Sequence, residues 1–124
     1  MATIEITDAN FREIYTNNQT VFLDFWAPWC GPCRMFGPIF EAASEKHPDI
    51  VFGKINTEQE QKLAAHFGIR SIPTIMVIKE QIEIFSQPGA IGEEHLTELI
   101  QKVNELDMKE VKQKIAEEEA KNSN

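Results

Sequence analysis

The segment VFLDFWAPWCGPC, residues 21–33, joins a nearly continuous apolar run to both cysteines of this 124-residue chain. Its first six residues are rich in β-forming side chains, which is typical of a strand buried on both faces of a sheet. The proline at position 32 suits the first turn of a helix, because the N–H that it lacks would have no partner there. The segment therefore predicts a buried strand that leads through a short loop into a helix.

The rest of the chain continues this alternation of extended and helical patterns. Strands are predicted over residues 3–6, 21–26, 50–55, 74–79 and 81–85, and helices over residues 7–15, 32–47, 57–67 and 92–106. Thr7 and the pair Thr57 and Glu60 are interpreted as N-terminal caps, and Pro38 predicts a kink in its helix. The order of elements indicates an α/β fold whose early strands run parallel and whose last two strands form an antiparallel hairpin.

The composition describes one ordinary globular domain. Hydrophobic residues make up 42% of the chain and charged residues 26%, and the formal net charge is −8. An acidic chain is a poor partner for nucleic acid or an anionic membrane surface, since both attract basic patches. No apolar run is long enough to span a bilayer, and the N-terminus shows no secretory signal, so a cytoplasmic monomer is expected.

The C-terminal segment, residues 107–124, breaks the helical phase of the preceding residues and is separated from a domain over residues 1–106. Asp107 and Glu110 are predicted to form a capping box, and the segment offers only three apolar anchors, which are Met108, Val111 and Ile115. A helix this short is marginal by itself. Two interpretations stay open: a solvated, partly frayed extension, or a helix that docks on the domain or a partner.

Cys30 and Cys33 lie at the predicted strand-to-helix junction with two residues between them. This spacing places both side chains on one face of the first helical turn, close enough for a disulfide. The helix N-terminus is expected to stabilise a thiolate on Cys30, the more exposed thiol, while Cys33 keeps its proton one turn further in. The pair is therefore interpreted as a redox site with Cys30 as nucleophile and Cys33 as resolving thiol.

Other uses of the two thiols are less well supported. A zinc site needs about four ligands, and the three histidines lie without ligand spacing at His47, His66 and His95. Inert packing is disfavoured because this spacing at a strand-to-helix junction is a recognised redox signature. A metal cluster shared between two copies has no independent support, so no metal site is predicted.

Asp24 interrupts the apolar run six residues before Cys30. Burial is expected to raise the pKa of its carboxyl toward neutrality, the range in which a group can accept and return a proton. We expect Asp24 to deprotonate Cys33 through a water molecule, and Lys54, on the adjacent parallel strand, to tune Asp24. The alternatives are an Asp24 that points into solvent from an edge strand and a Lys54 that extends out of its strand end.

Ile72, Pro73 and Trp29 are candidates for contact with a client protein. Pro73 directly precedes the third long strand, and the backbone of Ile72 could pair with an extended client segment. A trans peptide is the local expectation for Pro73, because sequence does not reveal a cis bond. Trp26 is interpreted mainly as a core residue, whereas Trp29 adjoins the nucleophile and is expected to cover the thiols or touch a client.

The motif WAPWCGPCRMFGP, residues 26–38, closely resembles the thioredoxin family, together with Asp24, Lys54, FGIRSIPT at 67–74 and Gly89-Ala90. The match covers about residues 3–106. The resemblance implies a central mixed sheet with helices on both faces, and a cis peptide at Pro73. It also implies the roles given above for Cys30, Cys33, Asp24 and Lys54. Clients are implied to contact a patch formed by Trp29, Gly31, Pro32, Ile72, Pro73, Gly89 and Ala90.

The resemblance further implies a protein-disulfide reductase that carries no bound cofactor beyond its redox-active Cys30–Cys33 disulfide. An NADPH-dependent thioredoxin reductase would regenerate the dithiol, and disulfide-containing client proteins would be the substrates. Gly31-Pro32 resembles the dipeptide of reducing thioredoxins, whereas oxidases and isomerases of this fold commonly carry a histidine between the cysteines. Two alternatives remain: such an oxidase or isomerase, and a redox-regulated binding module that holds partner proteins.

Three positions depart from the family pattern. The hairpin has Glu80-Gln81 where a glycine turn is usual, so its turn is expected to be less tight or strained. Pro88 precedes Gly89 where a small apolar residue is common, and Gly92 replaces a Ser or Thr helix cap. These departures affect the shape of the client surface rather than the chemistry.

Overall fold

The computed structural model of the chain describes residues 2–122. Its elements in chain order are β1 (Thr3–Glu5), α1 (Phe11–Asn17), β2 (Thr20–Trp26), α2 (Gly31–Lys46), β3 (Val51–Asn56), α3 (Gln61–His66), β4 (Thr74–Lys79), β5 (Ile82–Pro88), α4 (Glu93–Glu105) and α5 (Met108–Asn122). Every predicted strand and helix is found, in the predicted order. No helix within these residues combines the length and apolarity needed to cross a bilayer.

The five strands form one mixed sheet in the order β1-β3-β2-β4-β5. β3 runs parallel to both β1 and β2, whereas β4 runs antiparallel to both β2 and β5. This arrangement confirms the predicted parallel N-terminal strands and antiparallel C-terminal hairpin. Because β2 lies at the centre, the loop that follows it opens at the carboxyl end of the parallel strands, where α/β folds place their ligands.

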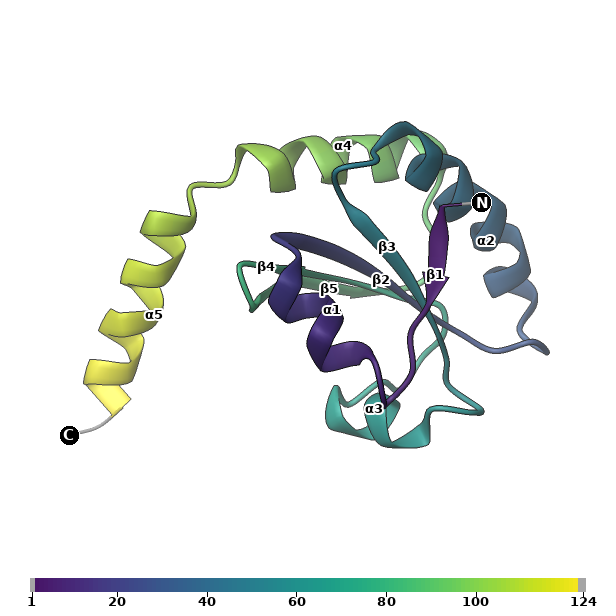
Figure 1. Cartoon of the computed structure of the whole chain (residues 1–124), viewed down its shortest axis with the longest axis horizontal. Coiled ribbons are helices and arrows are strands. Elements are labelled where there is room, and N and C mark those ends of the chain that lie inside the picture. The colour runs from purple at the N-terminus through teal and green to yellow at the C-terminus, as the bar shows by residue number, and fades with distance from the viewer. Residues whose placement is uncertain (1, 123–124) are drawn as a thin grey trace.

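Successive residues of β2 point to opposite faces of the sheet, and both faces are covered (Figure 1). One core holds Phe22 and Phe52 of the sheet with Phe36 and Phe40 of α2 and the apolar face of α4. The opposite core contains Val21, Leu23, Phe25, Ile55, Leu63 and Met76, against which α1 and Phe67 pack. Because both faces of β2 are buried, residues 21–26 are apolar at nearly every position.

Two predicted helix caps are wrong. α3 begins only at Gln61 and has no side-chain cap. Thr57 instead continues the pairing of β3 with β2, since its amide and its hydroxyl both donate to the carbonyl of Trp26, at 2.8 and 3.1 Å. The Glu60 side chain accepts a hydrogen bond from the Asp8 amide. α1 likewise begins at Phe11 rather than at Thr7, because the Thr7 amide donates to the Asn10 side chain in a turn before the helix.

The β4–β5 hairpin turns tightly at Glu80 and Gln81. Lys79 pairs directly with Ile82, so these two residues form the whole turn. Their φ angles are 50° and 68°, in the left-handed region that side chains with a Cβ seldom adopt. The turn is therefore tight and strained. This confirms the strain expected from the absence of the usual glycine, but the turn has not become less tight.

The C-terminal segment is helical over residues 108–122, and most of its side chains are exposed, as in the solvated interpretation. Asp107 caps α5 as predicted, accepting hydrogen bonds from the amides of Lys109 and Glu110 at 3.0 and 3.3 Å. Met108 is buried, and Lys112 forms a 2.6 Å ion pair with Glu80 in the hairpin turn. The first turns of α5 are thus held on the domain, while Figure 1 shows the helix extending away from the sheet. The domain boundary at residue 106 stays a prediction.

Candidate active site

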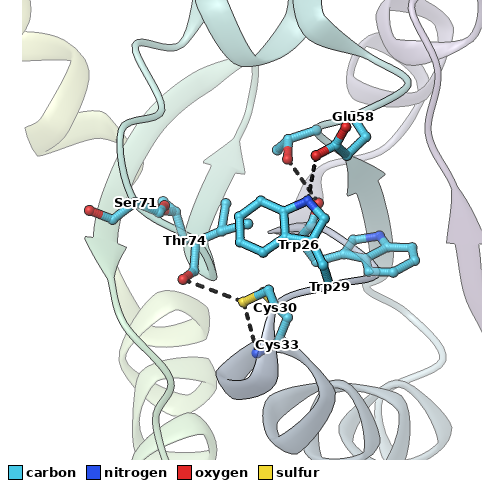
Figure 2. Close-up of a disulfide and its surroundings, with 9 residues drawn as sticks. Trp26, Trp29, Cys30, Cys33, Glu58, Ser71 and Thr74 are labelled. Atoms are coloured by element: carbon cyan, nitrogen blue, oxygen red, sulfur yellow. Dashed lines mark hydrogen bonds between the residues drawn. A yellow bond between two sulfur atoms is a disulfide. The ribbon is translucent and has the colours of Figure 1, made fainter.

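Cys30 and Cys33 form a disulfide at the N-terminus of α2, with their Cα atoms 5.2 Å apart (Figure 2). Cys30 is the N-cap residue of this helix, and its sulfur accepts a hydrogen bond of 3.2 Å from the backbone amide of Cys33. The amide belongs to the first turn, whose N–H groups lack partners within the helix and carry the positive end of its dipole. The arrangement therefore favours negative charge on the Cys30 sulfur.

The expected difference in exposure between the cysteines is not found. Cys30 is 4% exposed and Cys33 is 3% exposed. Both pack in a small cluster with Ala27, Trp26 and Ile72, which covers the two sulfur atoms together when they are joined. What distinguishes the two cysteines in this structure is the helix-cap hydrogen bond to Cys30.

The loop before β4 approaches the disulfide. The peptide bond between Ile72 and Pro73 is cis, as the family resemblance implies and against the local expectation of trans. The carbonyl oxygen of Ile72 lies 3.7 Å from the Cys30 sulfur. The Gly89 amide donates to the Pro73 carbonyl at 2.8 Å, which brings the end of β5 to the same place. Pro73 is itself buried, so it contributes to this surface chiefly through its backbone.

Trp29 directly precedes Cys30 and has 66% of its surface exposed. Its indole N–H donates a hydrogen bond to the carboxylate of Glu58, which follows β3 (Figure 2). The other predicted contact residues, Gly31, Pro32, Gly89 and Ala90, are exposed or half-buried around the same loop ends. The structure thus brings together three segments that are far apart in sequence.

Asp24 lies two residues before the end of β2, is 0% exposed, and has no hydrogen-bond partner for either carboxyl oxygen within the described chain. This burial rules out the alternative of a solvent-facing edge position. Desolvation raises the pKa of the Asp24 carboxyl from 3.8 to about 7, although the positive charge of Lys54 partly opposes the rise. The carboxyl therefore changes its protonation state near neutral pH.

Lys54 is the residue directly paired with Asp24 on the neighbouring strand β3. Its ammonium lies 4.9 Å from the centre of the Trp26 ring, where the negative face of the indole attracts a cation. It also lines a surface cavity of about 310 Å³ whose walls include Trp26, Cys33, Arg34, Gly37 and Glu41. Lys54 is therefore close enough to influence Asp24, but it is held toward this cavity.

Sequence reasoning missed Glu41, Glu58 and the exposed Met35. Glu58 contacts Trp29, and Glu41 shares the cavity with Lys54. Met35 is 75% exposed two residues after Cys33. The available signal for Glu41 was its position two helical turns after Arg34 on the same helix, which is too weak to distinguish it from other surface glutamates.

Comparison with known proteins explains this combination of features. The family model for thioredoxin matches residues 2–102. The chain belongs to the thioredoxin family. Within residues 2–122 there is no group of three or more His, Cys, Asp or Glu side chains placed to hold a metal ion. The paired cysteines of a thioredoxin are redox-active, and the chain is accordingly a thiol–disulfide oxidoreductase.

Individual thioredoxins are similar over most of this chain. A putative thioredoxin 2 of Streptomyces coelicolor is 50% identical over 119 residues, covering 96% of this chain and 89% of the relative. A thioredoxin of Pyropia yezoensis is 43% identical over 104 residues, covering 82% and 97%. The solved structure of a mutant thioredoxin from Halobacterium salinarum superposes with a TM-score of 0.77 at 30% identity, covering 85% and 92%. The first similarity extends beyond residue 106 and thus into the C-terminal segment.

Proposed function

We propose that this thioredoxin reduces disulfides in client proteins, with Cys30 as nucleophile and Cys33 as resolving thiol. The observation that carries the assignment is the 3.2 Å hydrogen bond from the Cys33 amide to the Cys30 sulfur at the start of α2. A thiolate is the reactive form of cysteine, and this hydrogen bond together with the helix dipole lowers the free energy of a thiolate on Cys30. Within the described chain, the sulfur of Cys33 accepts no equivalent hydrogen bond.

The reaction transfers two electrons from the dithiol to the client. The Cys30 thiolate attacks one sulfur of the client disulfide, forming a mixed disulfide and releasing the other client sulfur as a thiolate, which takes a proton from solvent. Cys33 then loses its proton and attacks the Cys30 sulfur. The Cys30–Cys33 disulfide forms, the mixed disulfide breaks, and the second client sulfur leaves as a thiolate, which takes a proton from solvent.

Asp24 is proposed to accept the Cys33 proton in the second step, through a water molecule. A pKa of about 7 suits this task, because the carboxyl can take up a proton and return it at neutral pH. Lys54, which faces Asp24 across the paired strands, is proposed to modulate that pKa through its charge.

Clients are proposed to lie across the exposed Trp29 and the backbone around Pro73. The loop from Ser71 to Pro73 lies outside the strands, and the Ile72 carbonyl faces Cys30. An extended client segment could pair with the Ile72 backbone and place its disulfide beside the Cys30 sulfur. The proposed contact residues are Trp29, Gly31, Pro32, Ile72, Pro73, Gly89 and Ala90.

The dithiol is proposed to be regenerated by an NADPH-dependent thioredoxin reductase in the cytoplasm. Support comes from the family and from the Gly31-Pro32 dipeptide, which matches reducing members. The net charge of −8 favours neither nucleic acid nor an anionic membrane as a partner.

The equilibrium potential of the Cys30–Cys33 couple against glutathione tests the direction of electron flow. A couple more reducing than glutathione is expected, together with reduction of insulin disulfides in the presence of dithiothreitol. An oxidising potential would contradict the proposal and favour an oxidase. The Cys30→Ser/Cys33→Ser variant is the control and should lose insulin reduction completely. A partner protein whose activity the double variant still supports would point to a binding module.

A further inference from the structure

The surface cavity next to Cys33 contains a carboxylate whose position calls for an explanation. Glu41 of α2 lines this cavity together with Lys54. One oxygen of Glu41 accepts a 2.6 Å hydrogen bond from the Thr3 hydroxyl, so the side chain is tied to β1. Its other oxygen is buried and has no hydrogen-bond partner within the described residues. A buried carboxylate oxygen without a partner is costly unless a cation can reach it.

Lys54 is placed to reach both the buried Asp24 and the partly buried Glu41. Among residues 2–122 its ammonium forms no ion pair with Asp24 or with Glu41. It lies over the Trp26 ring and against α2, where a Cβ atom on Gly37 would be 3.5 Å from the nitrogen. The ammonium is thus placed between β2 and α2, and each of these elements carries a buried carboxylate oxygen without a hydrogen-bond partner in the described chain.

We propose that Glu41 is a positioning residue that shares the Lys54 ammonium with Asp24. When Asp24 is protonated, the ammonium moves toward the free oxygen of Glu41. When Asp24 is ionised, the ammonium moves toward Asp24. Trp26 holds the cation between the two positions, because the face of an indole attracts an ammonium without donating or accepting a proton.

Because the Lys54 ammonium is shared with Glu41, the pKa of the Asp24 carboxyl stays near neutrality. A cation held permanently against a carboxylate lowers its pKa by about 1–3, and a lowered pKa would make Asp24 a weak proton acceptor. Around Asp24, the paired residue of β4 is the uncharged Ile75. The titratable and charged groups that face the site from other elements are Lys54 of β3 and Cys33, Arg34 and Glu41 of α2.

The test is the titration of the Asp24 carboxyl, followed by NMR in the oxidised protein, where neither cysteine titrates. Glu41→Gln removes the competing charge while its amide oxygen can still accept from Thr3. The variant should lower the Asp24 pKa by about 0.5, a fraction of the shift that a direct counter-ion produces. Glu45→Gln is the matched control, because it removes the same charge one helical turn further along α2 from an exposed position.

The same titration in a variant that lacks the Lys54 ammonium separates two causes of the Asp24 pKa shift, namely sharing of Lys54 and direct repulsion between the two carboxylates. In a Lys54→Met background, Glu41→Gln should shift the Asp24 pKa by less than half of its effect in the wild type. Equal shifts in the two backgrounds would overturn the proposal, as would an unchanged pKa in the single variant. The inference rests on the proposed role of Asp24, but the titration uses no client. Failure of that role would appear separately, as a pH profile of insulin reduction that Asp24→Asn leaves unaltered.

Discussion

Asp24 and Lys79 are both ionisable, both buried and both on central strands of the sheet, but their surroundings differ. Asp24 is 0% exposed with no hydrogen-bond partner for its carboxyl in the described chain, whereas Lys79 is 6% exposed and its ammonium donates a 2.6 Å hydrogen bond to the carbonyl of Val103. That carbonyl lies in the last turn of α4, where helix carbonyls lack intrahelical partners and a cation is favoured. The Lys79 ammonium thus joins α4 to the sheet, whereas the Asp24 carboxyl has no such partner and can titrate near neutral pH.

The two ends of the sheet differ in the same way. The end with the disulfide contains groups whose chemistry can change, namely two cysteines and Asp24 with its raised pKa. The hairpin end contains Lys79 and the Glu80–Lys112 ion pair, which hold α4 and α5 in place. Buried polar groups near the disulfide thus reduce stability in favour of function, and those at the hairpin end stabilise the fold.

Replacing Asp24 by Asn should give the largest change in stability. The folded protein keeps the Asp24 proton up to about pH 7, whereas the unfolded chain loses it near pH 3.8. Wild-type stability therefore falls as pH rises between these values and stays low above pH 7. The loss amounts to about 4 kcal/mol.

Urea unfolding of both proteins at pH 4 and pH 8.5 measures this difference. The Asn variant should be close to the wild type at pH 4 and more stable by about 4 kcal/mol at pH 8.5. A gain that is the same at both pH values would contradict the raised pKa and indicate a packing effect instead.

Replacing Lys79 by Met should have the opposite sign. The variant loses a hydrogen bond from a charged donor to the end of α4, which is worth about 2 kcal/mol. Urea unfolding should report that loss of stability, and the Asp24 titration should not change. Lys109→Met, at an exposed position of α5, is the control and should have little effect. A Lys79→Met protein as stable as the wild type would remove the contrast between the two buried charges.

The smallest effect is expected at the hairpin turn. Gln81 has a φ of 68°, which glycine adopts without a steric penalty, so Gln81→Gly should raise the free energy of unfolding by about 1 kcal/mol. Gln87→Gly, within β5, is the matched control and should lower stability, because glycine weakens a strand. If both substitutions destabilise the protein equally, the turn at Gln81 is not strained.

Much of the fold could be predicted because local pattern and tertiary environment agree. The apolar run at residues 21–26 is nearly continuous because β2 is covered on both faces, and the strand directions follow from the alternation of elements. The errors fall at helix starts. Thr57 has the residue type and spacing of a cap, but it still pairs with β2, and a pairing with a distant strand leaves no local trace.

The sequence by itself determined the cysteine spacing at a helix start, the proline in the first turn and the anomalous aspartate in an apolar run. These features depend on neighbours within a few residues, and they are sufficient to indicate the redox chemistry. Tertiary structure decided the cis peptide at Pro73, the approach of the Ile72 carbonyl to the Cys30 sulfur, and the placement of Lys54 between β2 and α2. Those properties arise where segments far apart in sequence meet, because the energy of a buried charge depends on every group around it.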